Sequence, residues 1–407
     1  MRFILLLSAI LFSASPLLSQ WVQKNSSVVT QRHHPVTFTL DDTAYLLTGT
    51  TIQSNPNGTS SFFRYNDEQD NWTQLDDFPG GARSYAYAAT YGGKAYFGFG
   101  SFDFNSFFND LWKFNHETQE WTELTPCPCA GRAHPAFVAH NGKIFVGLGG
   151  AGQDLNDWWE YDISTDQWTQ RPSLPAPGRH HPFHFAAGDY VYAGFGHSGS
   201  NYYADWYKYD PVEHSWTRMN DHPAGPRVAG QEFSHNGYGY VISGDGANHL
   251  NLQDGEFWRY EHEEDNWTRL PDHPGNPSDG RVGRWAPGAF VLKDHVYFFG
   301  GVNRGVGILF GDMYKFHLET PTPTTDIAVE DHAFQIYPNP ASDYLTLEIA
   351  DETLEPKRVS VFDVQGRELM RLPLTGNRVD ISELSNGLYF LQLESNSATE
   401  VRSFIKN

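Results

Sequence analysis

Short apolar runs that end in glycine recur along the first three quarters of the chain. Each run is long enough for one β-strand. Few stretches have the spacing of apolar residues that an amphipathic helix requires, so the pattern predicts an all-β protein. Six runs recur at a spacing of about 50 residues, and they lie at 45–49, 96–100, 145–150, 192–196, 240–244 and 297–301.

Two further features share this period, which indicates a repeat architecture whose units pack side by side. An aromatic residue stands seven positions before a tryptophan in five complete copies: Tyr65 and Trp72, Phe114 and Trp121, Tyr161 and Trp168, Tyr209 and Trp216, Tyr260 and Trp267. An arginine opens each apolar stretch in six copies: Arg32, Arg83, Arg132, Arg179, Arg227 and Arg284.

The two ends of the repeat region complement each other. The last unit has its arginine, its apolar run and the aromatic Phe316, but no tryptophan follows, whereas Trp21 has no preceding aromatic. If the segment around Trp21 pairs with the strand that ends at Phe316, six four-stranded sheets close into a ring. We therefore predict a six-bladed β-propeller over residues 20–319, closed by the N-terminal strand.

The repeat resembles the Kelch family, in which an arginine, a glycine doublet after an apolar strand and an aromatic–tryptophan pair recur. Complete doublets occur at Gly149-Gly150 and Gly300-Gly301. The resemblance implies that the repeated tryptophans, aromatics, glycines and acids serve packing, turns and bonds between blades. An acidic residue precedes the aromatic by four positions in five units, with Ser61 in its place in the other: Asp110, Asp157, Asp205, Glu256 and Asp312.

A second domain follows the repeats. A Pro/Thr-rich stretch at 320–333 predicts a semi-rigid linker, and alternating strands over 334–407 predict a small Ig-like β-sandwich. This tail resembles the C-terminal sorting domain (type A) of proteins exported by the type IX secretion system of Bacteroidetes-type bacteria. The resemblance implies that the secretion machinery is a partner and that the protein is released or attached at the cell surface. The matching residues are Tyr337, Pro338, Asn339, Pro340, Gly366, Asn386, Gly387, Tyr389 and Lys406.

Residues 1–19 resemble a secretory signal peptide, with basic Arg2, an apolar run at 3–12 and a cleavage site before Gln20. The apolar run is shorter than the roughly 20 residues that span a bilayer, and no later segment is apolar enough. The formal net charge is −21, and the sequence has no run of Lys and Arg that could form the basic face that nucleic acids require. No nucleic-acid partner is therefore predicted.

The arginines and the strand-ending glycines are predicted to surround one mouth of the central channel, together with the long loops that follow the glycines. Histidines gather there too, in the Arg-x-His-Pro segments that contain His134 and His181. The candidate ligand-binding residues are Arg32, Arg83, Arg132, Arg179, Arg227, Arg284, His134 and His181.

Three interpretations of this mouth remain open. Arginine and histidine can satisfy carbonyls and the repeated acids between blades. They can instead form a cationic funnel for a carboxylate or an acidic sugar. A third interpretation is a metal held by Cys127, Cys129 and His134, which lacks a defined fourth ligand; the two cysteines can equally be a disulfide or two thiols. No cofactor is predicted.

The preferred function is a non-catalytic binding module for a glycan, another polar ligand or a surface protein, because no catalytic constellation stands out. The enzymatic alternative is a sugar mutarotase, similar to the six-bladed Kelch enzymes that act on sialic acid, with Glu232 or Asp245 as the general base. A copper-radical oxidase is disfavoured, because such enzymes need a Cys–Tyr crosslink and the two cysteines lie together in one loop.

Overall fold

The structure is a computed structural model that describes residues 21–55, 57–274, 282–318, 334–349, 356–363, 367–374, 376–395 and 399–407. The predicted signal peptide and linker lie outside the described residues. The chain divides into two compact units, 1–320 and 321–407. None of the helices in the described residues is long and apolar enough to cross a membrane.

Six four-stranded antiparallel sheets form the described part of the first unit. From the inner to the outer strand, five of them are β3 (Val36–Leu40), β4 (Thr43–Leu47), β6 (Phe62–Asn66) and β7 (Asn71–Gln74); β8 (Tyr87–Tyr91), β9 (Lys94–Gly98), β10 (Leu111–Asn115) and β11 (Glu120–Leu124); β12 (Ala136–His140), β13 (Lys143–Gly147), β14 (Trp158–Asp162) and β15 (Gln167–Arg171); β16 (Phe183–Ala187), β17 (Tyr190–Gly194), β20 (Trp206–Asp210) and β21 (Ser215–Met219); β22 (Gln231–His235), β23 (Tyr238–Ile242), β24 (Phe257–Glu261) and β25 (Asn266–Leu270).

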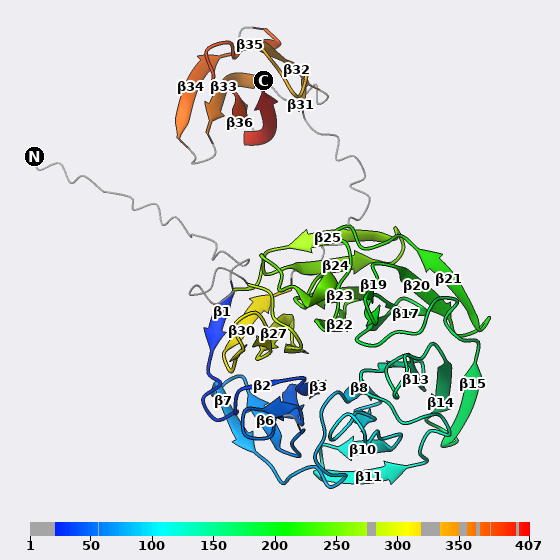
Figure 1. The fold of residues 1–407 in the computed structure, drawn as a ribbon. Coiled ribbons are helices and arrows are strands. Elements are labelled where there is room, and N and C mark those ends of the chain that lie inside the picture. Colours follow the sequence, from blue (N-terminus) through cyan, green and yellow to red (C-terminus); the bar gives the residue numbers. More distant parts are fainter. Residues whose placement is uncertain are drawn as a thin grey trace, which may run out of the picture. The chain divides into compact units, whose positions relative to one another are not determined.

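The sixth sheet closes the ring with strands from both ends of the repeat region. Its order is β26 (Gly288–Leu292), β27 (His295–Phe299), β30 (Met313–His317) and β1 (Val22–Lys24), in which Val22 pairs with Lys315. The inner strands contact one another in turn, and β26 contacts β3 (Figure 1). This confirms the predicted six-bladed propeller and its closure by the N-terminal strand.

The repeated aromatic residues face each other across the two outer strands of each blade. In the five complete copies the aromatic and the tryptophan are direct partners in the ladder, as Tyr161 and Trp168 are. The Trp21 and Phe316 rings, 5.1 Å apart, supply the sixth pair. Trp21 also donates its indole N–H to the Pro271 carbonyl of the preceding blade, so the N-terminal segment completes both a blade and a blade interface.

A ring of backbone hydrogen bonds links each blade to the next on one face of the propeller. The N–H of each strand-ending glycine donates to the carbonyl of the next repeat arginine, over 2.8 to 3.1 Å. Gly100 shows why glycine is needed: its φ is +89° and a Cβ there would lie 2.5 Å from the Ser84 carbonyl oxygen. The bond from Gly301 to Arg32 closes the ring.

Short elements in the connecting loops lie on this same face, which we call the mouth. They are β2 (Arg32–His33) paired with β5 (Thr50–Thr51), β18 (His197–Ser198) paired with β19 (Asn201–Tyr202), β28 (Val302–Asn303) paired with β29 (Ile308–Leu309), and the 3₁₀ turn η1 (Ala247–His249).

The second unit is a β-sandwich of two antiparallel sheets over one shared core. Tyr389 is mostly buried, and its hydroxyl donates to the Ser385 carbonyl. The Asn339 side chain accepts from the N–H of Ile405, which ties the start of the unit to its last strand. Gly366 lies outside the described residues. The strands are β31 (Phe334–Tyr337), β32 (Tyr344–Ile349) and β35 (Arg378–Asp380), with β34 (Glu368–Pro373), β33 (Pro356–Phe362), β36 (Gly387–Ser395) and β37 (Thr399–Lys406).

Candidate ligand site at the channel mouth

The six repeat arginines lie inside the blades rather than at an open surface. Each is exposed by at most 6%. Five of them bind the repeated acid of their own blade over 2.5 to 3.1 Å, and four of these pairs are bidentate. Arg32 is the exception, because it donates to the Ser61 hydroxyl and the Thr48 carbonyl instead.

The same guanidinium groups also fix the glycine turns. Arg132 donates to the carbonyl of Leu148, the residue before the strand-ending glycine, and four other repeat arginines make the equivalent bond. Burial alone would raise the pKa of Asp157, but its hydrogen bonds with Arg132 outweigh this effect and hold the pKa below its usual value. We call these arginine, acid and turn contacts the blade joints. They engage all six guanidinium groups that were predicted to bind a ligand, and all six side chains are buried.

Two residues after each repeat arginine, the chain adopts a left-handed conformation, with φ between 49° and 63°. Three of these residues are histidines, and their rings meet at the mouth. The ring centroids of His34 and His134 are 5.1 Å apart, those of His34 and His181 5.6 Å, and those of His134 and His181 3.6 Å. The six equivalent positions are His34, Tyr85, His134, His181, Ala229 and Ala286.

A cavity of about 530 Å³ opens beside two of these histidines, His134 and His181. We call it the mouth cavity. It contains the predicted residues His134 and His181, and it adds side chains from the loops of several blades. Its lining side chains include Phe104, Phe107, His134, Asp154, His180, His181, His197, His249, Trp285 and Arg304.

Arg304 differs from the repeat arginines because its side chain is 41% exposed. Its guanidinium group lies over the Trp285 ring, 5.1 Å from the centroid, and its Nη1 is 3.7 Å from Oδ2 of Asp245. The Asp245 side chain is fully buried, and neither of its oxygens has a hydrogen-bond partner. Burial raises the pKa of Asp245 to about 7, against the opposing effect of Arg304.

Burial keeps four imidazoles of the mouth neutral near pH 7, those of His34, His134, His181 and His197. It lowers the pKa of His34, His134 and His181 well below 6.5, and the neighbouring histidines lower these values further. At His197 burial lowers the pKa to about 4. These four imidazoles therefore offer neutral donors and acceptors beside the exposed guanidinium of Arg304.

The two cysteines do not take part in the predicted metal set. Cys127 and Cys129 form a disulfide with each other and are buried in the core between the second and third blades. Disulfide sulfurs provide no thiolate, so a site made of Cys127, Cys129 and His134 is not assembled. The same disulfide leaves no free cysteine in the described chain for the crosslink of a copper-radical oxidase.

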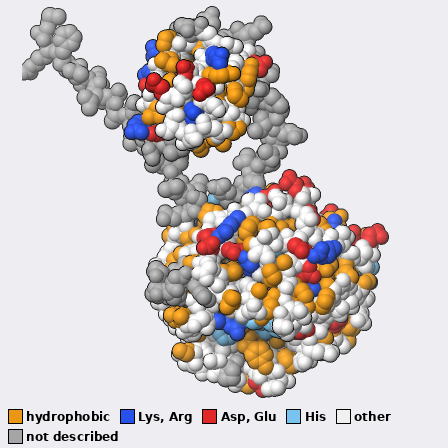
Figure 2. Space-filling view, turned by 45° about the horizontal axis from the view of Figure 1, so that its top comes forward, with side chains coloured by type: hydrophobic (Ala, Val, Ile, Leu, Met, Phe, Trp, Pro, Cys, Tyr) orange, Lys and Arg blue, Asp and Glu red, His pale blue; other side chains and the backbone are white. Residues whose placement is uncertain are grey.

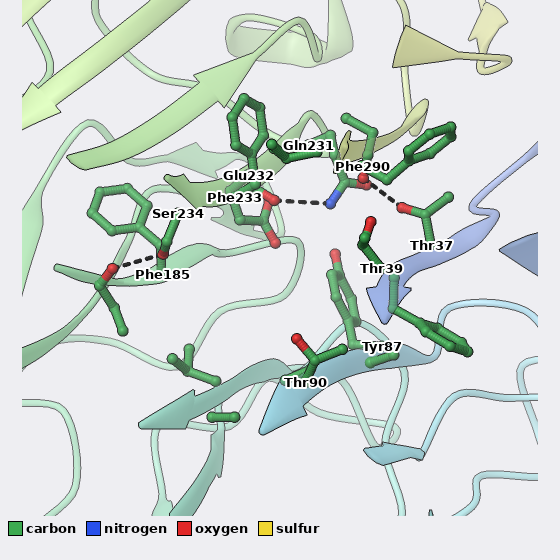
Figure 3. A pocket seen from close by; sticks show the side chains of 18 of the residues that line it. Thr37, Thr39, Tyr87, Thr90, Phe185, Gln231, Glu232, Phe233, Ser234 and Phe290 are labelled. Atoms are coloured by element: carbon green, nitrogen blue, oxygen red, sulfur yellow. Dashed lines mark hydrogen bonds between the residues drawn. The ribbon is translucent and has the colours of Figure 1, made fainter. Parts of the chain in front are cut away.

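A second cavity, the axial chamber, lies between the inner strands of all six blades (Figure 3). It measures about 460 Å³, and a cavity of only about 40 Å³ lined by His34 and Tyr87 lies beside it. Two hydroxyl groups of the chamber donate to backbone carbonyls of neighbouring blades, Ser234 to Ala186 and Thr37 to Ala289. These polar groups therefore serve contacts between blades.

Glu232, one of the two predicted bases, belongs to the axial chamber and not to the mouth. Its carboxyl lies 3.2 Å from Nε2 of His184, and both side chains are buried. Burial raises the pKa of Glu232 well above 4.5 and lowers the pKa of His184 to about 3, so burial disfavours the charged form of both groups.

Sequence reasoning located the histidines of the mouth but missed Arg304, Trp285, His249 and Phe104. All but Trp285 lie in loops after the strand-ending glycines, where the repeat gives no alignment. The available signal was loop length, together with Trp285 at a position where other repeats carry histidine, serine, alanine or valine. On the face shown in Figure 2, acidic and basic side chains are interspersed over the surface.

The fold and the repeat define a Kelch-type β-propeller. The family model described as "Attractin/LZTR1 beta-propeller" matches residues 44–314, more than half of the chain, and the chain belongs to this family. The model described as "Secretion system C-terminal sorting domain" matches residues 335–407. The protein thus carries a type IX sorting tail, which directs secretion and attachment at the cell surface.

One similar solved structure is titled "Structure of YjhT". It has a TM-score of 0.57 and 18% sequence identity, and the match covers 70% of this chain and 95% of that chain. This likeness supports the propeller fold alone. No curated protein matches the chain.

Proposed function

We propose that this exported propeller binds a glycan, in particular an acidic sugar, in the mouth cavity. The single observation that carries the proposal is the pairing of Arg304 with Trp285 at that cavity. A guanidinium group that no blade joint engages is available for a carboxylate, and it stands beside an aromatic ring.

Aromatic faces give such a cavity a surface for the apolar face of a sugar ring. Phe104 is 48% exposed, and its ring lies 4.4 Å from that of Tyr85. Trp285 faces the same cavity. Tyr85 in turn contacts His134, so a bound ring would lie against a rigid aromatic floor.

Polar groups around this floor can orient the hydroxyl groups of a sugar. His180 binds the Asp154 carboxylate through Nδ1 over 2.5 Å, which fixes the orientation of its ring. A few fixed polar groups in a cavity with aromatic walls are typical of small-ligand sites. The loops that carry them stand on a closed ring of blades, so the cavity is held in shape before a ligand arrives.

A glycan array tests this proposal. The wild-type protein should bind a subset of acidic glycans, and Arg304→Gln should lower the affinity for them by about 1.5–3 kcal/mol, the usual value of a hydrogen bond to a charged group. Trp285→Ala should weaken binding of acidic and neutral sugars alike. The matched control is Arg218→Gln, which changes an exposed arginine on β21. Equal binding by Arg304→Gln and Arg218→Gln would refute the proposal.

A second candidate, sugar anomer interconversion of the mutarotase type, is favoured by one observation. The Asp245 carboxyl has a pKa of about 7, and a group with such a pKa can both accept and donate a proton near neutral pH. It lies under Arg304 and His249, both of which line the mouth cavity. An anomer-equilibration assay should then show a rate above background that Asp245→Asn abolishes, whereas a background rate in the wild type removes this candidate.

A further inference from the structure

Three imidazoles lie together at the mouth, two of them lining the mouth cavity, and each has a ring nitrogen without a hydrogen-bond partner. The Nε2 atoms of His34, His134 and His181 are buried and have no hydrogen-bond partner. One nitrogen of each ring lies within 4.8 Å of one nitrogen of the other two. Buried polar atoms without partners are rare in native proteins, and each calls for an explanation.

An unpartnered imidazole nitrogen does not by itself indicate a ligand site in this protein. His222 and His273 also have unpartnered Nε2 atoms, but each takes the position at which other blades carry Phe78 or Leu174 and packs as a core residue. Among the described residues, neither of them belongs to a group of three or more potential metal ligands. What distinguishes the mouth is that three such nitrogens converge.

The hydrogen bonds around His181 determine which of its nitrogens carries a lone pair. The Gly199 carbonyl can only accept, so the Nδ1 of His197 that faces it, 3.5 Å away, is the donor. The Nε2 of the neutral His197 ring is then an acceptor and receives the Nδ1–H of His181 over 3.3 Å. The Nε2 of His181 is left with its lone pair.

His34 can adopt the same state. Its Nδ1 lies 2.7 Å from Nδ1 of His33, so one of the two donates to the other. When His34 is the donor, its Nε2 also presents a lone pair. Metal-bound histidines usually donate their second ring N–H to a neighbouring acceptor in this way, which fixes the tautomer and the ring orientation.

We propose that His34, His134 and His181 bind one divalent transition-metal ion through their Nε2 atoms. Three neutral imidazoles suit zinc, copper, nickel or cobalt, whereas calcium and magnesium prefer oxygen ligands. Zn–N distances are about 2.0–2.1 Å, so the three nitrogens, which lie within 4.8 Å of one another, must move closer together to bind one ion. His134 and His181 line the mouth cavity, so the remaining coordination position faces it and is open to an oxygen ligand.

The test measures metal content and affinity of the full chain, purified through a tag without histidines. After loading with Zn²⁺ and exhaustive dialysis, the wild type should retain roughly one ion per chain. Loss of an outer-shell partner already costs about 10–100-fold in affinity, so His134→Asn and His181→Asn should each cost at least that much. Asparagine is chosen because it tolerates the left-handed backbone at these positions.

The matched control is Tyr85→Asn, at the equivalent left-handed position of the second blade. It removes a neighbouring ring but no ligand, so it should retain the ion. Co²⁺ titration gives a second measurement, because d–d absorption bands should appear in the wild type and in Tyr85→Asn but not in the histidine variants. Circular dichroism of each variant verifies that it is folded.

Two results would overturn the proposal: a wild-type protein that retains none of Zn²⁺, Cu²⁺, Ni²⁺ and Co²⁺, or folded histidine variants that bind the ion as tightly as Tyr85→Asn. Neither measurement involves a sugar. The metal site can therefore fail while glycan binding stands, and glycan binding can fail while the metal site stands.

Discussion

The blade joints and the mouth cavity lie on the same face of the propeller, and both contain arginine and acidic side chains. In the joints these side chains hold each blade together, whereas at the mouth cavity the arginine is open to a ligand. Arg132 in a joint is buried, bidentate and bonded to a carbonyl, whereas Arg304 at the mouth is 41% exposed. The arginine that repeats builds the scaffold, and the arginine that does not repeat is available to a ligand. In a repeat protein, departures from the repeat are therefore the better guide to a binding site.

The largest effect expected from this comparison is on stability. Arg132→Ala leaves the Asp157 carboxylate in the joint without its partner, which should lower the free energy of unfolding by about 3–5 kcal/mol. Arg218→Ala, at an exposed pair with Asp221, should change it by no more than about 0.5 kcal/mol. Urea unfolding measures both. A stable Arg132→Ala protein that has lost glycan binding would contradict this comparison, because it would show that Arg132 binds the ligand rather than stabilising the fold.

A smaller effect on stability is expected when the pH is lowered, because two histidines are buried inside the blades. Burial, aided by Arg227 and by Arg284 respectively, lowers the pKa of His222 to about 4 and that of His273 to about 3. In the unfolded chain both titrate near 6.5. As the pH falls from 7.5 to 5, the unfolded state takes up protons that the folded state does not, so stability should fall by about 2 kcal/mol per histidine.

Thermal or urea unfolding of His222→Gln at the two pH values tests this second prediction. Its loss of stability on acidification should be smaller than that of the wild type by the contribution of one histidine. An unchanged pH dependence would mean that His222 takes up a proton in the folded blade over the same pH range as in the unfolded chain.

The smallest effect is a gain of stability in the one blade joint that has no carboxylate. Burial lowers the pKa of Arg32 to about 10, and the position of the repeated acid holds Ser61, whose hydroxyl lies 3.0 Å from Nη1 of Arg32. Ser61→Asp should restore the ion pair and stabilise the fold by about 1 kcal/mol. Ser61→Asn, which can accept a hydrogen bond but carries no charge, should gain less. A loss of stability in Ser61→Asp would show that this joint is built differently.

The propeller was predictable because its signals are periodic. The pairing of Trp21 with Phe316 followed from a missing tryptophan at one end and a missing aromatic at the other, and the structure has this pair. The sorting tail was recognisable from several separated motifs, which the family model matches. Regular spacing determines the strands and their register, so it was sufficient to predict the fold.

The site was only partly predictable because its residues are not periodic. The Arg-x-His-Pro segments placed His134 and His181 at the mouth, but the depth of each arginine in its blade depends on packing against the acid, which spacing does not determine. Arg304 and His249 come from loops of irregular length, and their approach to Asp245 is a tertiary contact. The state of Cys127 and Cys129 was also ambiguous, because a Cys-Pro-Cys sequence does not reveal whether the two thiols form a disulfide.

The most direct test of the account is a crystal structure of the propeller with the acidic glycan that binds best on the array. The account predicts that the sugar lies in the mouth cavity, with its carboxylate on Arg304 and a ring face against Trp285 or Phe104, while all six repeat arginines keep their partners. A sugar bound in the axial chamber, or one whose carboxylate displaces a repeated acid from its arginine, would contradict it.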